Sequence, residues 1–311
     1  MTINSSQKVA LLPIHGMGPV NSKFADKLKK AIQRRLGKSW EKVLFRPVHY
    51  QKVLQDNQDR VWESMQKRSL DWTRLRRFVL FGFSDAAGIE RNAHREGSPY
   101  ARVQQIIQAE LQAIYDETEN PNLPVVVIAQ SLGGHVISNY IWDAQSVYRR
   151  DAVRCTRGVW AADGSTSEAD GGADAARAEN ADANSVDAFL RLRKLRFLYT
   201  TGCNIPIFVA SFPEPKIVPI ATDQYGYDFR WKNFFDDDDV LGWPLKPLSN
   251  AYNNAVYFDK RVNAGGLVTN WNPFSHGRYW TDDELLSELV ADVENLLGES
   301  SKGNDDSPSV D

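Results

Sequence analysis

The stretch from Val125 to Gly134 constrains the fold more than any other part of the sequence. Pro124 is followed by VVVIA at 125–129, an uninterrupted and mostly β-branched run that is typical of a strand buried on both faces. Residues 132–142 then follow a helical pattern. A buried strand that turns directly into a helix is the building unit of a parallel α/β sheet.

A second unit of the same kind lies at the start of the chain. Residues 9–14 and 41–50 are apolar runs, and 22–36 between them carry apolar side chains at four-residue spacing, as on one helical face. A strand, a helix and a strand joined in this way predict parallel pairing. Further strands are expected at 195–201, 228–235 and 254–262, and helices at 100–115 and 282–297. We therefore predict an α/β fold with a mostly parallel central sheet flanked by helices on both faces.

The domain organisation predicted from these patterns is a single α/β domain over residues 8–298. A helical decoration is expected near 51–100, where an apolar stripe of Trp72, Leu75, Val79 and Phe83 follows a helical period. We expect this stripe to pack on the core or a cap; contact with a membrane surface is the alternative. Residues 163–187 hold almost no large apolar side chain and predict a flexible polar insertion, and 299–311 predict a disordered tail.

Composition excludes several classes of protein. The chain of 311 residues has 37 Lys and Arg against 40 Asp and Glu, so its net charge of -3 offers no field that would attract nucleic acid. No window reaches the roughly 18 apolar residues of a spanning helix, and the start lacks the pattern of a secretory signal. The two cysteines, Cys155 and Cys203, have no metal-site spacing. We expect a soluble cytoplasmic protein without a bound metal.

Ser131 is the candidate nucleophile. It lies at the point where the 125–129 strand passes into the helix, and a tight turn there would expose its side chain at the edge of the sheet. Such a turn requires small neighbours, and Ala129 and Gly133 occupy those two positions. The pattern therefore predicts nucleophilic chemistry, with a serine that merely begins a helix as the alternative.

A serine needs a base, and the chain offers five histidines. His276 lies in a loop bounded by Pro273 and Gly277 after the last expected strand, where a rigid scaffold can aim a catalytic side chain. His135 would point along the helix that follows Ser131. His49 and His94 lie outside any motif, so His276 is the expected base.

The turn His15-Gly16-Met17-Gly18 follows the first expected strand. Its glycines would let backbone amides face a neighbouring loop, so the N–H groups of Met17 and Leu132 could together form an oxyanion hole. His15 is then expected to be structural.

Taken together, HGMG, AQSLGG, the acidic cluster after DFRWKNFF and the late SHGRYW resemble the α/β-hydrolase superfamily, in its lipase and esterase branch. The resemblance covers about residues 8–298. It implies eight or slightly fewer strands, a Ser-His-Asp triad, acyl-enzyme chemistry and no cofactor. Ala129 stands where glycine is commoner, and 51–100 has no counterpart.

The resemblance also implies a triad acid among the four consecutive aspartates 236–239. In related hydrolases the acid lies eight residues after a strand tryptophan, and counting from Trp231 gives Asp239. Asp236 and Asp238 are the alternatives, and Asp259, inside the next expected strand, is a more distant one.

The expected function is hydrolysis of carboxylic esters through an acyl-enzyme on Ser131, with His276 as general base and Asp239 as the acid that orients it. The expected partner is a small-molecule or lipid ester. Two alternatives remain open. The same triad could cleave thioesters or amides or transfer acyl groups, and the fold could serve a non-catalytic binding or scaffold protein. The sequence specifies neither the acyl chain length nor the oligomeric state.

Overall fold

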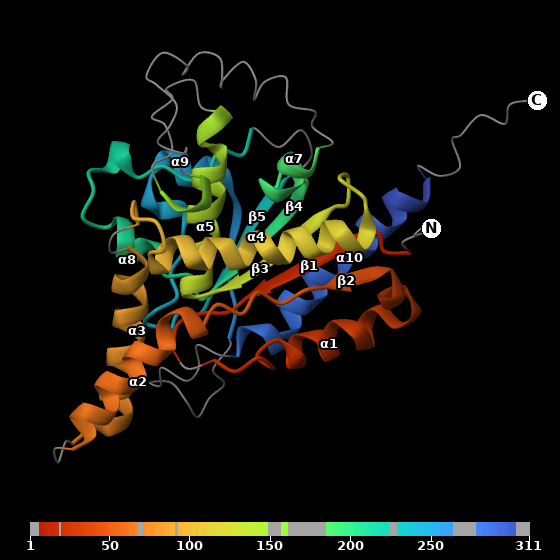
Figure 1. The fold of residues 1–311 in the computed structure, drawn as a ribbon. Helices are drawn as coiled ribbons and strands as arrows, with labels where there is room; N and C mark the ends of the chain where they lie inside the picture. Colours follow the sequence, from red (N-terminus) through yellow and green to blue (C-terminus); the bar gives the residue numbers. More distant parts are fainter. Residues whose placement is uncertain are drawn as a thin grey trace, which may run out of the picture.

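The centre of the molecule is a six-stranded parallel sheet with the strand order β2-β1-β3-β4-β5-β6 (Figure 1). The computed structural model describes residues 6–18, 20–67, 71–90, 93–148, 157–160, 185–223, 229–263 and 278–302. The strands are β1 (Val9–Ile14), β2 (Val43–Phe45), β3 (Val125–Gln130), β4 (Leu195–Thr201), β5 (Arg230–Phe235) and β6 (Val256–Arg261). All neighbouring strands pair in parallel, which confirms the predicted parallel α/β class.

Helices cover both faces of this sheet. In β1, Val9 and Leu11 belong to a core shared with α1 (Asp26–Leu36) and α10 (Asp283–Lys302). Ala10 and Leu12 belong to a second core shared with α4 (Pro99–Thr118) and α5 (Leu132–Ala144). This alternation follows from the two-residue period of a strand, and it explains why β1 is apolar at every position.

Shorter helices connect these layers. They are α7 (Val186–Leu190), α8 (Ile205–Val209) and α9 (Asn250–Ala255), with 3₁₀ segments at Gly37–Lys42, Gln145–Tyr148, Gly158–Trp160, Glu214–Lys216, Lys246–Leu248 and Tyr279–Thr281. Within the described residues, no helix is long and apolar enough to cross a bilayer.

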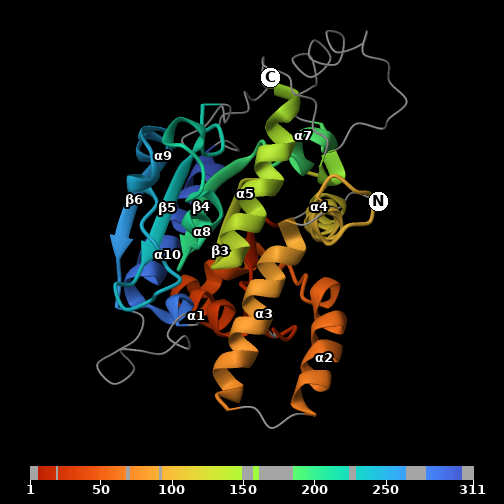
Figure 2. The ribbon, with the colours of Figure 1, turned by 90° about the vertical axis from the view of Figure 1, so that its left-hand side faces the viewer.

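Two helices, α2 (Lys52–Gln66) and α3 (Thr73–Glu90), form a hairpin that stands away from the sheet (Figure 2). Trp62 and Phe81 are buried between them, with ring centroids 6.4 Å apart. The expectation that Trp72, Val79 and Phe83 pack on the core is wrong, because these side chains are 74%, 44% and 61% exposed. Phe81 faces the partner helix, so the opposite face of α3 points outward. The side chain of Leu75, the fourth member of the stripe, is not among those described.

Two segment boundaries differ from those expected. α10 continues to Lys302, so the first four residues of the predicted tail 299–311 are helical, and Glu299 accepts hydrogen bonds of 3.0 and 3.3 Å from Arg196. The remainder of that tail lies outside the described residues. So does most of the predicted insertion at 163–187, although Ser185 is described and caps α7 by accepting from the Ala188 amide at 3.1 Å.

The strand order places a topological switch point between β1 and β3. From β1 the chain crosses to β2 on one side, whereas β3 pairs with the other side of β1 and later strands continue outward to β6. The segments that leave β1 and β3 therefore diverge. Open α/β sheets bind ligands at the carboxyl ends of strands at such a switch point.

Candidate functional site

Ser131 lies at this switch point, between the end of β3 and the start of α5. Its backbone has φ +53° and ψ -124°, in the region that L-residues rarely adopt. Two hydrogen bonds of 2.9 Å hold this turn, from the Ser131 amide to the Thr201 carbonyl and from the Gly134 amide to the Ser131 carbonyl. The residue is 1% exposed, and its Oγ has no hydrogen-bond partner among the described residues. A buried hydroxyl therefore lies on a strained backbone at the switch point and makes no hydrogen bond within the described residues.

Glycines allow three segments to meet around Ser131. A Cβ on Gly16 would lie 2.7 Å from Ser131 Cβ, and a Cβ on Gly133 would lie 2.5 Å from the His15 carbonyl oxygen. On the other side, a Cβ on Gly134 would lie 2.8 Å from Cys203 Sγ. These approaches leave no room for side chains, so the loop after β1, the start of α5 and the loop after β4 pack directly together.

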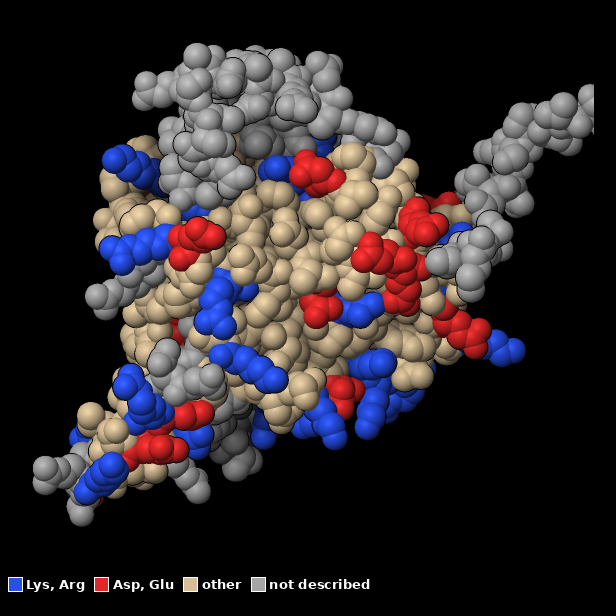
Figure 3. All heavy atoms as spheres, viewed as in Figure 1, with Lys and Arg blue, Asp and Glu red and all other residues tan. Residues whose placement is uncertain are grey.

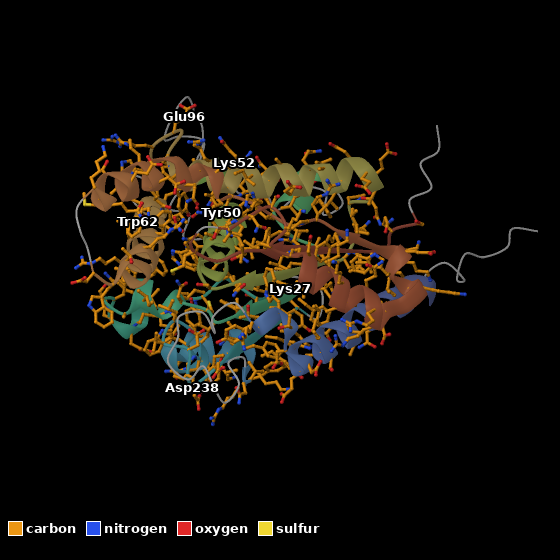
Figure 4. The ribbon with its side chains drawn as sticks, turned by 90° about the horizontal axis from the view of Figure 1, so that it is seen from below. Lys27, Tyr50, Lys52, Trp62, Glu96 and Asp238 are labelled. Carbon is orange, nitrogen blue, oxygen red and sulfur yellow. The ribbon has the colours of Figure 1, made fainter. Side chains whose placement is uncertain are left out.

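His15 anchors the loop after β1 and has no free nitrogen. Its Nδ1 lies 2.7 Å from the Gly16 carbonyl and its Nε2 lies 3.1 Å from the Tyr50 amide, which can only donate. The proton is therefore on Nδ1. Burial lowers the pKa of His15 to about 3, so the ring is neutral at neutral pH. Its ring stacks on Tyr50, whose hydroxyl donates to the His15 carbonyl at 2.8 Å. Figure 4 shows Tyr50 in the interior.

The helical hairpin holds the other end of this loop. Asp85 of α3 is fully buried and accepts a hydrogen bond of 2.8 Å from the Gly18 amide, while Gln58 of α2 donates to its second carboxylate oxygen. Burial raises the pKa of Asp85 to about 6, against the opposing effect of these two hydrogen bonds. A Cβ on Gly82 would lie 2.6 Å from Met17 Sδ. Met17 therefore sits between a fixed Gly16 and a fixed Gly18.

Sequence reasoning missed Asp85 and Gln58. The segment 51–100 matches no motif, and the partner of Asp85 is 67 residues away along the chain. The available signal was a single acidic residue, Asp85, on the apolar stretch 78–89 of the sequence.

Asp239 follows β5 at the same edge of the sheet. Its carboxylate is buried and accepts from the Tyr279 hydroxyl at 2.8 Å and from the Leu241 amide at 3.1 Å. Burial and the neighbouring Asp239 raise the pKa of Tyr279. A Cβ on Gly242 would lie 2.6 Å from Asp239 Oδ2 and 2.9 Å from the Cα of Gly202, the residue after Thr201. The carboxylate therefore lies beside the strand end whose carbonyl holds Ser131.

The other candidate acids have different surroundings. Asp237 and Asp238 are exposed, Asp237 pairs with Arg261 at 2.8 Å, and Figure 4 shows Asp238 at the rim of the molecule. Asp236 is buried and accepts from the Asp238 amide at 3.0 Å. Asp259 accepts from Asn233 and from the amides of Leu245 and Lys246, so it holds a loop in place.

The expected base, His276, lies outside the described residues. The described residues on either side of it bond to the end of β5 and to the loop that follows β5. The Val262 amide donates to the Phe235 carbonyl at 2.9 Å, and the Tyr279 hydroxyl donates to Asp239.

The remaining histidines have other partners or none near Ser131. His135 stacks on Phe208 with centroids 3.7 Å apart, His49 bonds the Val20 carbonyl, and His94 is exposed. The part of the chain that the structure describes contains no group of three or more His, Cys, Asp or Glu side chains that could hold a metal ion.

Comparison with known proteins adds no assignment, since no protein-family model and no curated protein sequence matches the chain.

Proposed function

We propose that the chain is a serine hydrolase with an α/β-hydrolase fold and that it cleaves carboxylic esters. One observation carries the proposal: Ser131 holds a strained backbone at the switch point of a parallel sheet, and its buried hydroxyl has no partner among the described residues. The strain costs roughly 1–3 kcal/mol and is retained mostly at functional sites. A serine that only began a helix would cap it with its hydroxyl, and Ser131 makes no such bond to α5.

In the proposed reaction, Ser131 Oγ attacks the acyl carbonyl carbon while His276 removes the hydroxyl proton. The tetrahedral intermediate collapses, its bond to the alcohol oxygen breaks, and the alcohol leaves with the proton that His276 returns. Water, deprotonated by the same histidine, then attacks the acyl-enzyme; the bond to Ser131 Oγ breaks, His276 returns the proton to Oγ, and the acid leaves.

The amides of Met17 and Leu132 are proposed to stabilise the oxyanion. Leu132 is the first residue of α5, where backbone amides have no partner within the helix. Met17 is held between Gly16, which abuts Ser131, and Gly18, which Asp85 fixes. We assign Asp85 as a positioning residue for this loop.

Asp239 is the proposed orienting acid. It is buried at the strand end next to Ser131, and it keeps its orientation through bonds from Tyr279 and Leu241. His276 lies three residues before Tyr279 in the sequence, which supports its pairing with this carboxylate.

Ester turnover by single variants tests this assignment. Ser131→Ala should reduce hydrolysis of a p-nitrophenyl ester to background, and Asp239→Asn should reduce kcat by about 10³–10⁴-fold, as expected when a histidine loses its orienting acid. Asp237→Asn is the matched control, because the exposed Asp237 carboxylate pairs only with Arg261 among the described residues. Turnover retained by Ser131→Ala would overturn the mechanism. A folded protein that cleaves no ester, thioester or amide would favour a binding role.

A further inference from the structure

The outer faces of the α2–α3 hairpin expose large apolar side chains. Trp72, which directly precedes α3, is 74% exposed, and Val79 and Phe83, four residues apart on α3, are 44% and 61% exposed. Met65, near the end of α2, is 50% exposed. Buried partners such as Trp62 face inward between the helices, so these four residues do not hold the hairpin together.

The distal part of the hairpin is basic, whereas residues 52–90 as a whole hold seven Lys and Arg against six Asp and Glu. Residues 60–83 contain six Lys and Arg against two Asp and Glu, a net charge of +4 in a chain whose net charge is -3. Arg60, Lys67, Arg76 and Arg77 are exposed, and none of them has an acidic ion-pair partner within the described residues. Arg76 bonds the Asp71 carbonyl, and Arg77 lies over the Phe81 ring.

The hairpin projects from the body of the molecule, as Figures 1 and 2 show. Figure 3 shows Lys and Arg spheres, with Asp and Glu spheres among them, on this projecting end at the lower left. In the view of Figure 4, Trp62 of α2 and Lys27 of α1 lie on well-separated parts of the molecule. The projecting end of the hairpin therefore lies away from the sheet.

We propose that the α2–α3 hairpin docks on a lipid bilayer that contains anionic lipids. Exposed Trp, Phe, Val and Met side chains would enter the headgroup region, while the unpaired Lys and Arg side chains would neutralise lipid phosphates and carboxylates. The exposed cations favour an anionic membrane over an apolar protein groove. A neutral groove would match the apolar side chains but would leave the four cations without a partner of opposite charge. The proposal concerns binding alone and holds whether or not the ester hydrolysis proposed above is correct.

Sedimentation with vesicles of phosphatidylcholine, alone or mixed with phosphatidylserine, tests this proposal. The full chain should bind the mixed vesicles, bind pure phosphatidylcholine at least tenfold more weakly, and lose affinity as salt increases. The charge variant Arg60→Gln with Lys67→Gln and Arg76→Gln should weaken binding by about tenfold or more. The apolar variant Trp72→Asp with Phe83→Asp should do the same.

Matched controls are available elsewhere on the surface. Lys27→Gln with Lys30→Gln and Arg34→Gln removes the same charge from exposed positions of α1, and Tyr257→Asp changes an aromatic side chain that is 56% exposed on β6. Both controls should retain binding within about twofold of the parent. Equal losses in the hairpin and α1 variants, or no binding to mixed vesicles, would overturn the proposal. The proposal would also be overturned if light scattering showed that the parent is a dimer and that Trp72→Asp is not. The apolar face would then contact a second copy of the chain.

Discussion

At the scale of single residues, Ser131 concentrates unfavourable features that the surrounding structure sustains. Its φ of +53° would suit glycine, and its buried hydroxyl lacks a hydrogen bond within the described residues. Each feature costs on the order of 1–3 kcal/mol. The bonds to Thr201 and Gly134 and the contact with Gly16 hold the residue in this state.

Removing the unpaired hydroxyl of Ser131 or its backbone strain should stabilise the protein. Ser131→Ala removes the unpaired hydroxyl but keeps the Cβ, so its free energy of unfolding should equal or exceed that of the parent by up to about 1 kcal/mol. Ser131→Gly also relieves the backbone and should be more stable than Ser131→Ala by about 1 kcal/mol. Urea unfolding measures both. An alanine variant at least as stable as the glycine variant would contradict the strain argument.

Asp85 should make stability depend on pH. Its pKa is raised from 3.8 to about 6, so the folded state favours the protonated carboxyl. Its contribution to the free energy of unfolding is largest below about pH 4, where the carboxyl is protonated in both states. That contribution is lost as pH rises from about 4 through about 6. Asp85→Asn should therefore be more stable than the parent at pH 8, by at most about 3 kcal/mol, with the difference shrinking toward pH 4.

The asparagine can keep the neighbouring bonds. Its oxygen can still accept from Gly18, and Gln58, whose Oε1 is buried without a partner among the described residues, can rotate to accept from the new amide. Melting temperatures across pH 4–8 check the prediction, and a stability difference that does not vary with pH would contradict it.

Asp85→Leu leaves the Gly18 amide unpaired and should lower kcat more than it changes KM.

At the scale of elements, the close approach of α5 to β1 positions the two loops of the site. Gly133 lies against the carbonyl oxygens of Ile14 and His15, which belong to the end of β1 and its loop and cannot move like the tip of a side chain.

Gly133→Ala should therefore destabilise the protein by about 1–3 kcal/mol and reduce ester turnover. Gly298→Ala is the matched control in α10, where a Cβ meets no atom within 4 Å, and it should stabilise by about 0.5–1 kcal/mol. Thermal unfolding of both variants measures these two changes in stability. Equal effects would mean that the contact with β1 does not constrain α5.

Several elements could be predicted from the sequence because their patterns are local. The β-branched run 125–129 and the apolar run 9–14 predict buried parallel strands, which β3 and β1 confirm. In the segment 51–100 the apolar stripe predicts a helix, and α3 covers most of it, but periodicity shows an apolar stripe without showing what covers it. Here Phe81 contacts α2, and Trp72, Val79 and Phe83 are left outside.

At the scale of the whole molecule, the site is assembled from segments far apart in the chain. Ser131, Gly16 and Asp239 follow three different strands, and the parallel sheet brings their ends to one edge. Sequence motifs could indicate Ser131 and Gly16 because serine and glycine at strand ends leave a local pattern, whereas Asp239 is favoured among three aspartates only through the family resemblance. The Asp85–Gly18 bond depends on how the hairpin folds back on the sheet, so no local pattern predicts it.

Covalent labelling with a fluorophosphonate tests the central claim most directly, because it reports an activated serine without knowledge of the natural substrate. Mass spectrometry of the folded protein should find one probe per chain, on Ser131, with no labelling after denaturation. Asp239→Asn should slow the labelling strongly, and Asp237→Asn should not. A folded protein that never reacts, or one labelled at a different residue, would contradict Ser131 as the nucleophile.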